Sequence, residues 1–152
     1  MRPLLFLVAV GIVAVVCCRA LAGAADTKTL QGTWEVAELI VGGAKVPAKD
    51  VQGMKFIFKG QILTILPPTA DTGVVEKRTF TFKLDPKQKP AAVDLTSLDG
   101  DNKGVVSPGI YEITADTLRW CQSDDEKAKE RPKDFTSPEK SRVYVFTFKR
   151  GK

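Results

Sequence analysis

The sequence contains no histidine, so it lacks the imidazole base that many enzymes use near neutral pH. Ser-His-Asp catalysis, Cys-His catalysis and zinc sites built on histidine are therefore excluded. The sequence also lacks a Gly-rich phosphate loop, a Gly-X-Ser-X-Gly elbow and a Cys-X-X-Cys pair. We therefore expect no catalytic residue, no metal and no cofactor, with an enzyme of unknown class as the last alternative.

An excess of charge of one sign is also missing. The chain has 23 basic and 18 acidic residues, which gives a formal net charge of +5 over 152 residues. The basic residues are dispersed among the acidic ones, so we expect no nucleic acid partner. A chain of this length fits one domain.

The first 24 residues have the layout of a secretory signal peptide. Arg2 supplies a positive start, residues 4–16 form an apolar run, and Ala22 and Ala24 are small residues before a cleavage site. We expect cleavage after Ala24, with cleavage after Ala22 as the alternative, and export to the periplasm or the extracellular space. The apolar run is shorter than the roughly 20 residues of a membrane span, so we expect no transmembrane segment after cleavage.

Cysteine is scarce. Cys17 and Cys18 lie in the segment that we expect to be removed, and they would carry a lipid anchor only if the signal is of the lipoprotein type. Val16 disfavours that alternative, because such signals usually have Gly, Ala or Ser before the cysteine. The mature chain keeps Cys121 alone and forms no intramolecular disulfide. We expect a buried thiol there, with an intermolecular link as the alternative.

After a short leader at residues 25–29, the domain at residues 30–150 alternates apolar and polar residues between turns, which predicts strands. A helical turn is expected at residues 47–52 and a charged loop, either solvated or a lid, at residues 123–140. Eight short strands favour an all-β fold, an eight-stranded antiparallel up-and-down barrel, because closure removes exposed sheet edges. A two-sheet sandwich is the alternative. The expected strands are residues 34–41, 54–59, 62–66, 74–84, 92–98, 105–114, 117–122 and 142–150.

Alternation along these strands assigns ten bulky rings to one face, which would be the barrel interior. Each ring buries about 150–250 Å², so the interior is either filled by side chains or holds one small ligand. The rings are Trp34, Phe56, Phe58, Phe80, Phe82, Tyr111, Trp120, Tyr144, Phe146 and Phe148.

Three charged residues, Glu38, Glu76 and Arg78, fall on the same inward-facing parity. Because a buried charge needs a partner, we expect them to form ion pairs near the barrel mouth or to orient the polar head of a ligand. The ligand-binding residues predicted from the sequence are Glu38, Phe56, Phe58, Arg78, Phe80, Tyr111, Trp120 and Tyr144.

Several separated motifs occur in a fixed order. Leu30-Gln31-Gly32-Thr33-Trp34 opens the domain, Asp85-Pro86-Lys87-Gln88-Lys89-Pro90 precedes Val93-Asp94-Leu95-Thr96, Gly109-Ile110-Tyr111-Glu112 precedes Asp116-Thr117-Leu118, and Arg131-Pro132 precedes Phe135. Over about residues 29–150 the chain resembles an uncharacterised lipocalin-like domain family of planctomycete bacteria. The resemblance implies a lipocalin-like barrel and no established activity.

Gly32-Thr33-Trp34 also resembles the Gly-X-Trp signature of lipocalins. That resemblance implies that Trp34 packs at the closed end of the barrel under an arginine from the last strand, the position of Arg150. The function expected is that of a secreted, non-catalytic lipocalin-like domain that binds a small apolar ligand in its barrel. The alternative is a cell-envelope interaction or structural module with a filled core, whose protein partner the sequence does not identify.

Overall fold

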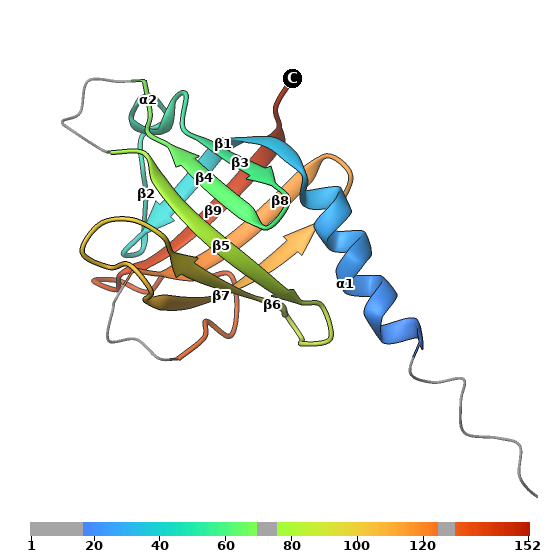
Figure 1. Cartoon of the computed structure of the whole chain (residues 1–152). Helices are drawn as coiled ribbons and strands as arrows, with labels where there is room; N and C mark the ends of the chain where they lie inside the picture. The colour runs from blue at the N-terminus through green and yellow to red at the C-terminus, as the bar shows by residue number, and fades with distance from the viewer. Residues whose placement is uncertain (1–16, 70–75, 125–129) are drawn as a thin grey trace, which may run out of the picture.

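The computed structural model describes residues 17–69, 76–124 and 130–152 (Figure 1). The apolar run at residues 4–16, on which the export prediction depends, lies outside the described residues. The elements are α1 (Cys17–Leu30), β1 (Gly32–Val41), β2 (Ala44–Lys45), α2 (Ala48–Val51), β3 (Lys55–Lys59), β4 (Ile62–Leu66), β5 (Arg78–Asp85), β6 (Ala91–Ser97), β7 (Val106–Ile113), β8 (Thr117–Ser123) and β9 (Val143–Arg150).

The sheet closes on itself. Among the described residues, nine strands form one antiparallel sheet in the order β2-β1-β3-β4-β5-β6-β7-β8-β9, and β9 also pairs with β1. Apart from β2, which is two residues long, each strand lies beside its neighbours in sequence, so eight strands form an up-and-down barrel. The predicted barrel is confirmed, and the two-sheet sandwich is wrong.

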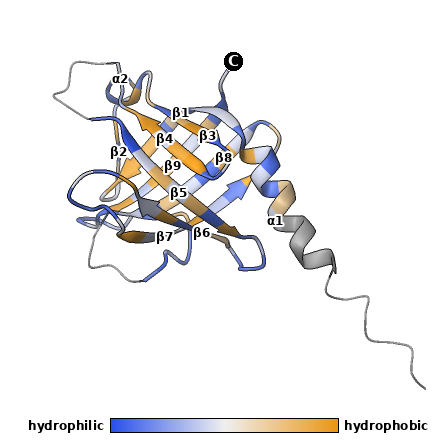
Figure 2. Ribbon diagram, viewed as in Figure 1, coloured by the Kyte–Doolittle hydropathy of each residue, from blue (hydrophilic) through white to orange (hydrophobic). Residues whose placement is uncertain are grey.

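Hydropathy alternates along the strands, and the turn between β5 and β6 is hydrophilic (Figure 2). Among the described residues two connections between strands are only two residues long, and one of them joins β3 to β4 through Gly60 and Gln61. Gly60 has a φ of 61°, a conformation that glycine adopts without the steric cost of a Cβ atom. The Gly60 amide donates to Gln31 Oε1 at 2.7 Å, so this turn is fixed to the residue that precedes β1.

Two helices lie at opposite ends of the barrel. The short helix α2 occurs where the sequence predicts a helical turn, and its buried Val51 packs against the core. The helix α1 was not predicted, because residues 25–29 were expected to be a polar leader. It contacts β5 and β7 and slants away from the barrel (Figure 1). The predicted cleavage after Ala24 falls inside α1 and would leave residues 25–30 of this helix.

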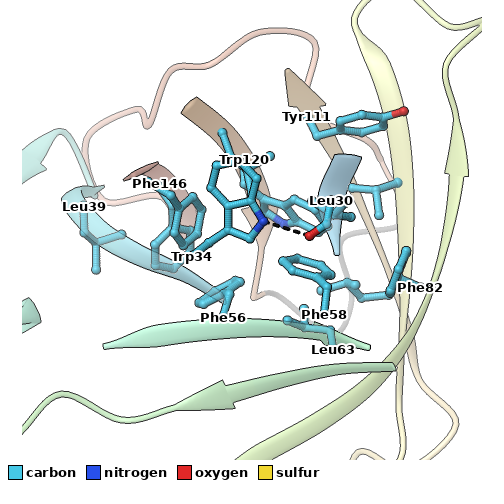
Figure 3. Packing of buried hydrophobic residues seen from close by; sticks show 14 of the residues in the cluster. Leu30, Trp34, Leu39, Phe56, Phe58, Leu63, Phe82, Tyr111, Trp120 and Phe146 are labelled. Carbon is cyan, nitrogen blue, oxygen red and sulfur yellow. Dashed lines mark hydrogen bonds between the residues drawn. The ribbon is translucent and has the colours of Figure 1, made fainter. Parts of the chain in front are cut away.

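One hydrophobic cluster fills the barrel (Figure 3). All ten rings assigned to the interior belong to it: eight are buried, and Phe80 and Tyr144 are partly buried. Phe56 contacts Phe148 with ring centroids 4.7 Å apart, and Phe58 contacts Phe82 edge to face at 5.3 Å. Alternation therefore predicted the core-facing rings correctly.

Candidate functional site

The closed end of the barrel joins the first and last strands. Trp34 is fully buried, and the guanidinium of Arg150 lies over its ring at 4.2 Å from the centroid. Arg150 also donates to the backbone carbonyls of Thr29, Gln31 and Ala115. The indole Nε1 of Trp34 donates to the Leu30 carbonyl at 2.8 Å (Figure 3). The predicted pairing of Trp34 with Arg150 is confirmed.

The centre of the barrel holds four of the residues predicted to bind a ligand: Phe56, Phe58, Tyr111 and Trp120. Each is at most 2 % exposed. The ring centroids of Phe58 and Trp120 are 5.9 Å apart and those of Tyr111 and Trp120 are 6.4 Å apart, so the rings themselves occupy the space between them. The structure brings these residues together as a packed core.

The Tyr111 hydroxyl points away from the ring cluster (Figure 3). It donates to Asp26 Oδ2 at 2.6 Å and so fixes α1 to β7. Burial, and then the hydrogen bond to the Asp26 carboxylate, raise the pKa of the Tyr111 hydroxyl well above its usual value. This tyrosine therefore acts as a neutral hydrogen-bond donor across the physiological pH range.

The opposite end of the barrel is partly apolar and partly polar. Phe80 and Tyr144 lie there, partly buried, at the starts of β5 and β9. Trp120 Nε1 donates to Gln122 Oε1 at 3.0 Å, and Gln122 Nε2 donates to the Ser107 carbonyl at 2.6 Å. The amide of Gln122 thus satisfies the buried indole and joins β7 to β8.

The predicted inward orientation of Glu38 is wrong. A β-bulge shifts the register between Val36 and Glu38 on β1, so that Val36 pairs with Phe148 and Glu38 with Thr147. The extra residue reverses which side chains face the core, because strand side chains alternate with a period of two. Leu39 is buried in the core, whereas Glu38 forms an ion pair with Lys45 at the surface.

Arg78 and Glu76 also lie away from the interior. Arg78 pairs with Ile65 at the first position of β5, and its side chain is exposed at the rim. Glu76 precedes the strand and is exposed as well. Within the described residues no ion pair joins Glu76 to Arg78, so the expected pairing of buried charges is wrong.

The outer face of β7, β8 and β9 is covered by the chain itself. A second cluster contains Ile110, Cys121 and Val145, with Phe135 packed against it. Cys121 is fully buried and free, as predicted. Burial raises the pKa of its thiol to about 11, so the reactive thiolate is scarce at neutral pH.

Arg131 holds this covering segment to the barrel. Its guanidinium donates to the carbonyls of Val93 and Gly109 at 2.7 and 2.6 Å, and to Asp94 Oδ1 at 2.7 Å. These acceptors lie on β6 and β7 beside Pro108, whose nitrogen has no hydrogen to donate to the strand ladder. Arg131 therefore joins two strands where a proline interrupts their own hydrogen bonding.

Two recesses lie on the barrel surface. The larger, of about 1030 Å³, is a groove between α1 and the outer face of β5 and β6, and Lys28, Thr81, Lys83, Thr96 and Val106 contribute to its lining. The smaller, of about 270 Å³, adjoins it.

Charged and polar residues line the smaller recess, among them Lys83, Asp85 and Arg131. The Gln88 side-chain amide and the Lys87 backbone N–H donate to Asp85 and hold the pKa of its carboxyl below the usual range. Neither recess is lined by the central rings Trp34, Phe56 and Trp120.

No family model, curated protein or solved structure matches this chain significantly. The described residues contain no group of three or more Cys, Asp or Glu side chains placed to hold a metal ion. Neither described helix is long and apolar enough to cross a membrane.

The sequence did not indicate two of these surface features. The groove requires α1, which was not expected, and Arg131 was assigned only to a motif and a charged loop. The one local signal was Arg131-Pro132 in the long loop, because an arginine side chain offers five N–H donors that backbone carbonyls can accept.

Proposed function

We propose that the mature chain is an exported, non-catalytic interaction or structural module of the cell envelope, in which the barrel is a solid core. The observation that carries this proposal is the packing of Phe56, Phe58 and Trp120 at the barrel centre with direct ring contacts. Such a core supports the fold and leaves binding to the outer surface.

A second candidate is a binder of a small apolar ligand at the end of the barrel opposite Arg150. The partly buried Phe80 and Tyr144 at that end favour it, because apolar surface at a barrel mouth is a common ligand site. In this alternative the ligand rests against the rim rather than among the central rings.

Mass spectrometry of protein purified from its own host tests both candidates and the export proposal. Under native conditions we expect the mass of the polypeptide alone, and no uptake of an apolar fluorescent dye such as N-phenylnaphthylamine. A retained lipid-sized mass, lost on substitution of Tyr144 by Asp but not of the exposed Lys149 by Asp, would overturn the solid-core proposal and establish the rim ligand. The mass of the denatured polypeptide shows at which residue the chain begins. A chain that still begins at Met1 would overturn the proposal of export with cleavage.

A further inference from the structure

We propose that the groove between α1 and the outer face of β5 and β6 binds an extended, acidic segment of a partner polypeptide. This inference rests on the proposed function, a module that works through its outer surface, and it names the surface and the partner chemistry. Three observations carry it: the floor of the groove, its charge and its shape.

The floor of the groove is a row of uncharged side chains. Thr81 on β5 pairs with Thr96 on β6, and Thr96 pairs with Val106 on β7, so the three side chains lie side by side on the outer face. Two large hydrophobic side chains are exposed among the described residues, and Val106, at 54 %, is the more exposed of them. Phe135 packs on the outer-face cluster of β7, β8 and β9, whereas Val106 belongs to neither hydrophobic cluster of the described residues and stays largely exposed.

The charge of the groove is positive. Lys28 on α1 and Lys83 on β5 line it, and neither forms an ion pair within the described residues. In the described part of the chain one carboxylate lines the groove, that of Asp94, and Arg131 already binds it at 2.7 Å. A partner that presents carboxylates therefore complements the groove and is steered toward it by the field of the two lysines.

The shape of the groove favours an extended polypeptide. A recess between a helix and a barrel wall admits a narrow chain, whereas a flat bilayer reaches only the outer edges of such a recess. Among the described residues Phe82 is the only ring in the lining, and it is 6 % exposed, so bases of single-stranded nucleic acid would find no aromatic surface there for stacking. The threonine hydroxyls of the floor offer hydrogen bonds to a peptide backbone.

Signal cleavage after Ala24 would change one wall of the groove. Gly23 and Ala24 line the groove and would leave with the signal peptide, while Thr27 and Lys28 stay. The hydrogen bond from the Tyr111 hydroxyl to Asp26 joins the remaining part of α1 to β7. Both lysines of the groove therefore remain in the processed protein.

The test uses processed protein and a fluorescein-labelled synthetic peptide of alternating Asp and Val, followed by fluorescence anisotropy at low and high salt. We expect the peptide to bind and the matching Lys-Val peptide not to bind. Lys28→Glu with Lys83→Glu should weaken binding at least about tenfold, and Val106→Asp should weaken it as well. The matched control is Lys149→Glu, which should change affinity less than about twofold. Lys149 is an exposed lysine of β9 that forms no ion pair with another described residue.

Amide exchange then locates the complex, and we expect peptide-dependent protection on β5, β6 and α1. The proposal would be overturned if Lys149→Glu weakened peptide binding as much as Lys28→Glu with Lys83→Glu does. It would also be overturned if the peptide protected amides only on strands other than β5 and β6. Failure of the Asp-Val peptide to bind at all would also overturn it. So would binding of heparin or phosphatidylglycerol vesicles with the same affinity as the peptide, if Lys28→Glu with Lys83→Glu abolished that binding. A dimer that dissociates on Lys83→Glu would assign the groove to a second copy and also overturn it.

Failure of this proposal is distinguishable from failure of the proposed function. The native mass of the same sample reports the barrel core independently of the groove. If the native mass is that of the polypeptide alone and the peptide does not bind, only the groove proposal is overturned. If the native mass includes an additional lipid-sized mass, the solid-core proposal is overturned, whether or not the peptide binds.

Discussion

The guanidinium carbon of Arg150 lies 4.2 Å from the centroid of the Trp34 ring, and the two residues also pair across β1 and β9. The same guanidinium donates to three backbone carbonyls from two other segments. Charge-assisted hydrogen bonds and a cation–π contact add to each other here. The strength of barrel closure is therefore expected to depend strongly on this side chain.

Arg150→Ala should lower the free energy of unfolding by about 2–3 kcal/mol, because it removes the cation–π contact and the donors to Thr29, Gln31 and Ala115. Arg150→Lys should lower it less, since it keeps the charge but loses the planar fork. Urea denaturation followed by tryptophan fluorescence measures both. The neighbouring Lys149→Ala should stay within about 0.5 kcal/mol of the wild type, and a similar value for Arg150→Ala would contradict the expectation.

Gly109→Ala should destabilise the barrel by about 1–3 kcal/mol through overpacking. A Cβ atom at this position would lie 2.5 Å from Gln122 Oε1 and 2.7 Å from the Cys121 carbonyl oxygen. Gln122→Ala alone also costs stability, because it removes the acceptor of the Trp120 indole. Measured by urea denaturation in a Gln122→Ala background, Gly109→Ala should therefore cost less than in the wild type but still destabilise, because the Cys121 clash is with backbone. No cost of Gly109→Ala in that background would show that the backbone contact is unimportant.

Phe135→Ala should expose the Cys121 thiol while leaving the barrel folded. Phe135 covers the cluster that contains Cys121 and also lies 4.5 Å from the guanidinium of Arg119. We expect labelling by a thiol-reactive disulfide reagent to become at least about tenfold faster, because the protecting segment opens more easily. Phe135→Leu keeps an apolar cover and serves as the control, so equal labelling rates for the wild type and Phe135→Ala would argue against this role.

The stability of the protein should fall as the pH rises from about 9 to about 11. Burial raises the pKa of Cys121 from 9.0 to about 11, so the unfolded chain loses this proton at a lower pH than the folded chain. The contribution is fully present below the unfolded pKa and is lost as the pH passes through the folded pKa. Cys121→Ala should make the decline shallower in urea denaturation at each pH, and an unchanged slope would count against the assignment. Tyr111, whose pKa is also raised, accounts for part of the remaining decline.

The sequence predicted the barrel and its rings because alternation is unambiguous where large apolar and small polar residues alternate. Phe80 and Phe82 are separated by Thr81, and Phe146 and Phe148 by Thr147, so the parity of each strand is clear. On β1 the three consecutive apolar residues Leu39, Ile40 and Val41 suit either face. The bulge after Val36 therefore left no signal, and Glu38 was assigned to the wrong side.

The surface features could not be predicted because they depend on contacts between distant segments. Residues 25–29 read as polar, yet Asp26 is fixed by the Tyr111 hydroxyl, which is 85 residues away along the chain. Likewise, Phe135 is one ring in a charged loop, and only the position of Cys121 on the outer face explains what it covers. Periodicity describes one strand at a time and carries no information on such packing.

The hydrogen bonds from Arg150 to the carbonyls of Thr29 and Gln31 hold the two ends of the barrel chain close together. The chain enters and leaves the barrel at the same pole. Any tether or neighbouring domain joined at either side would emerge there, and the far pole, with α2 and the hairpin of β1 and β2, would face outward.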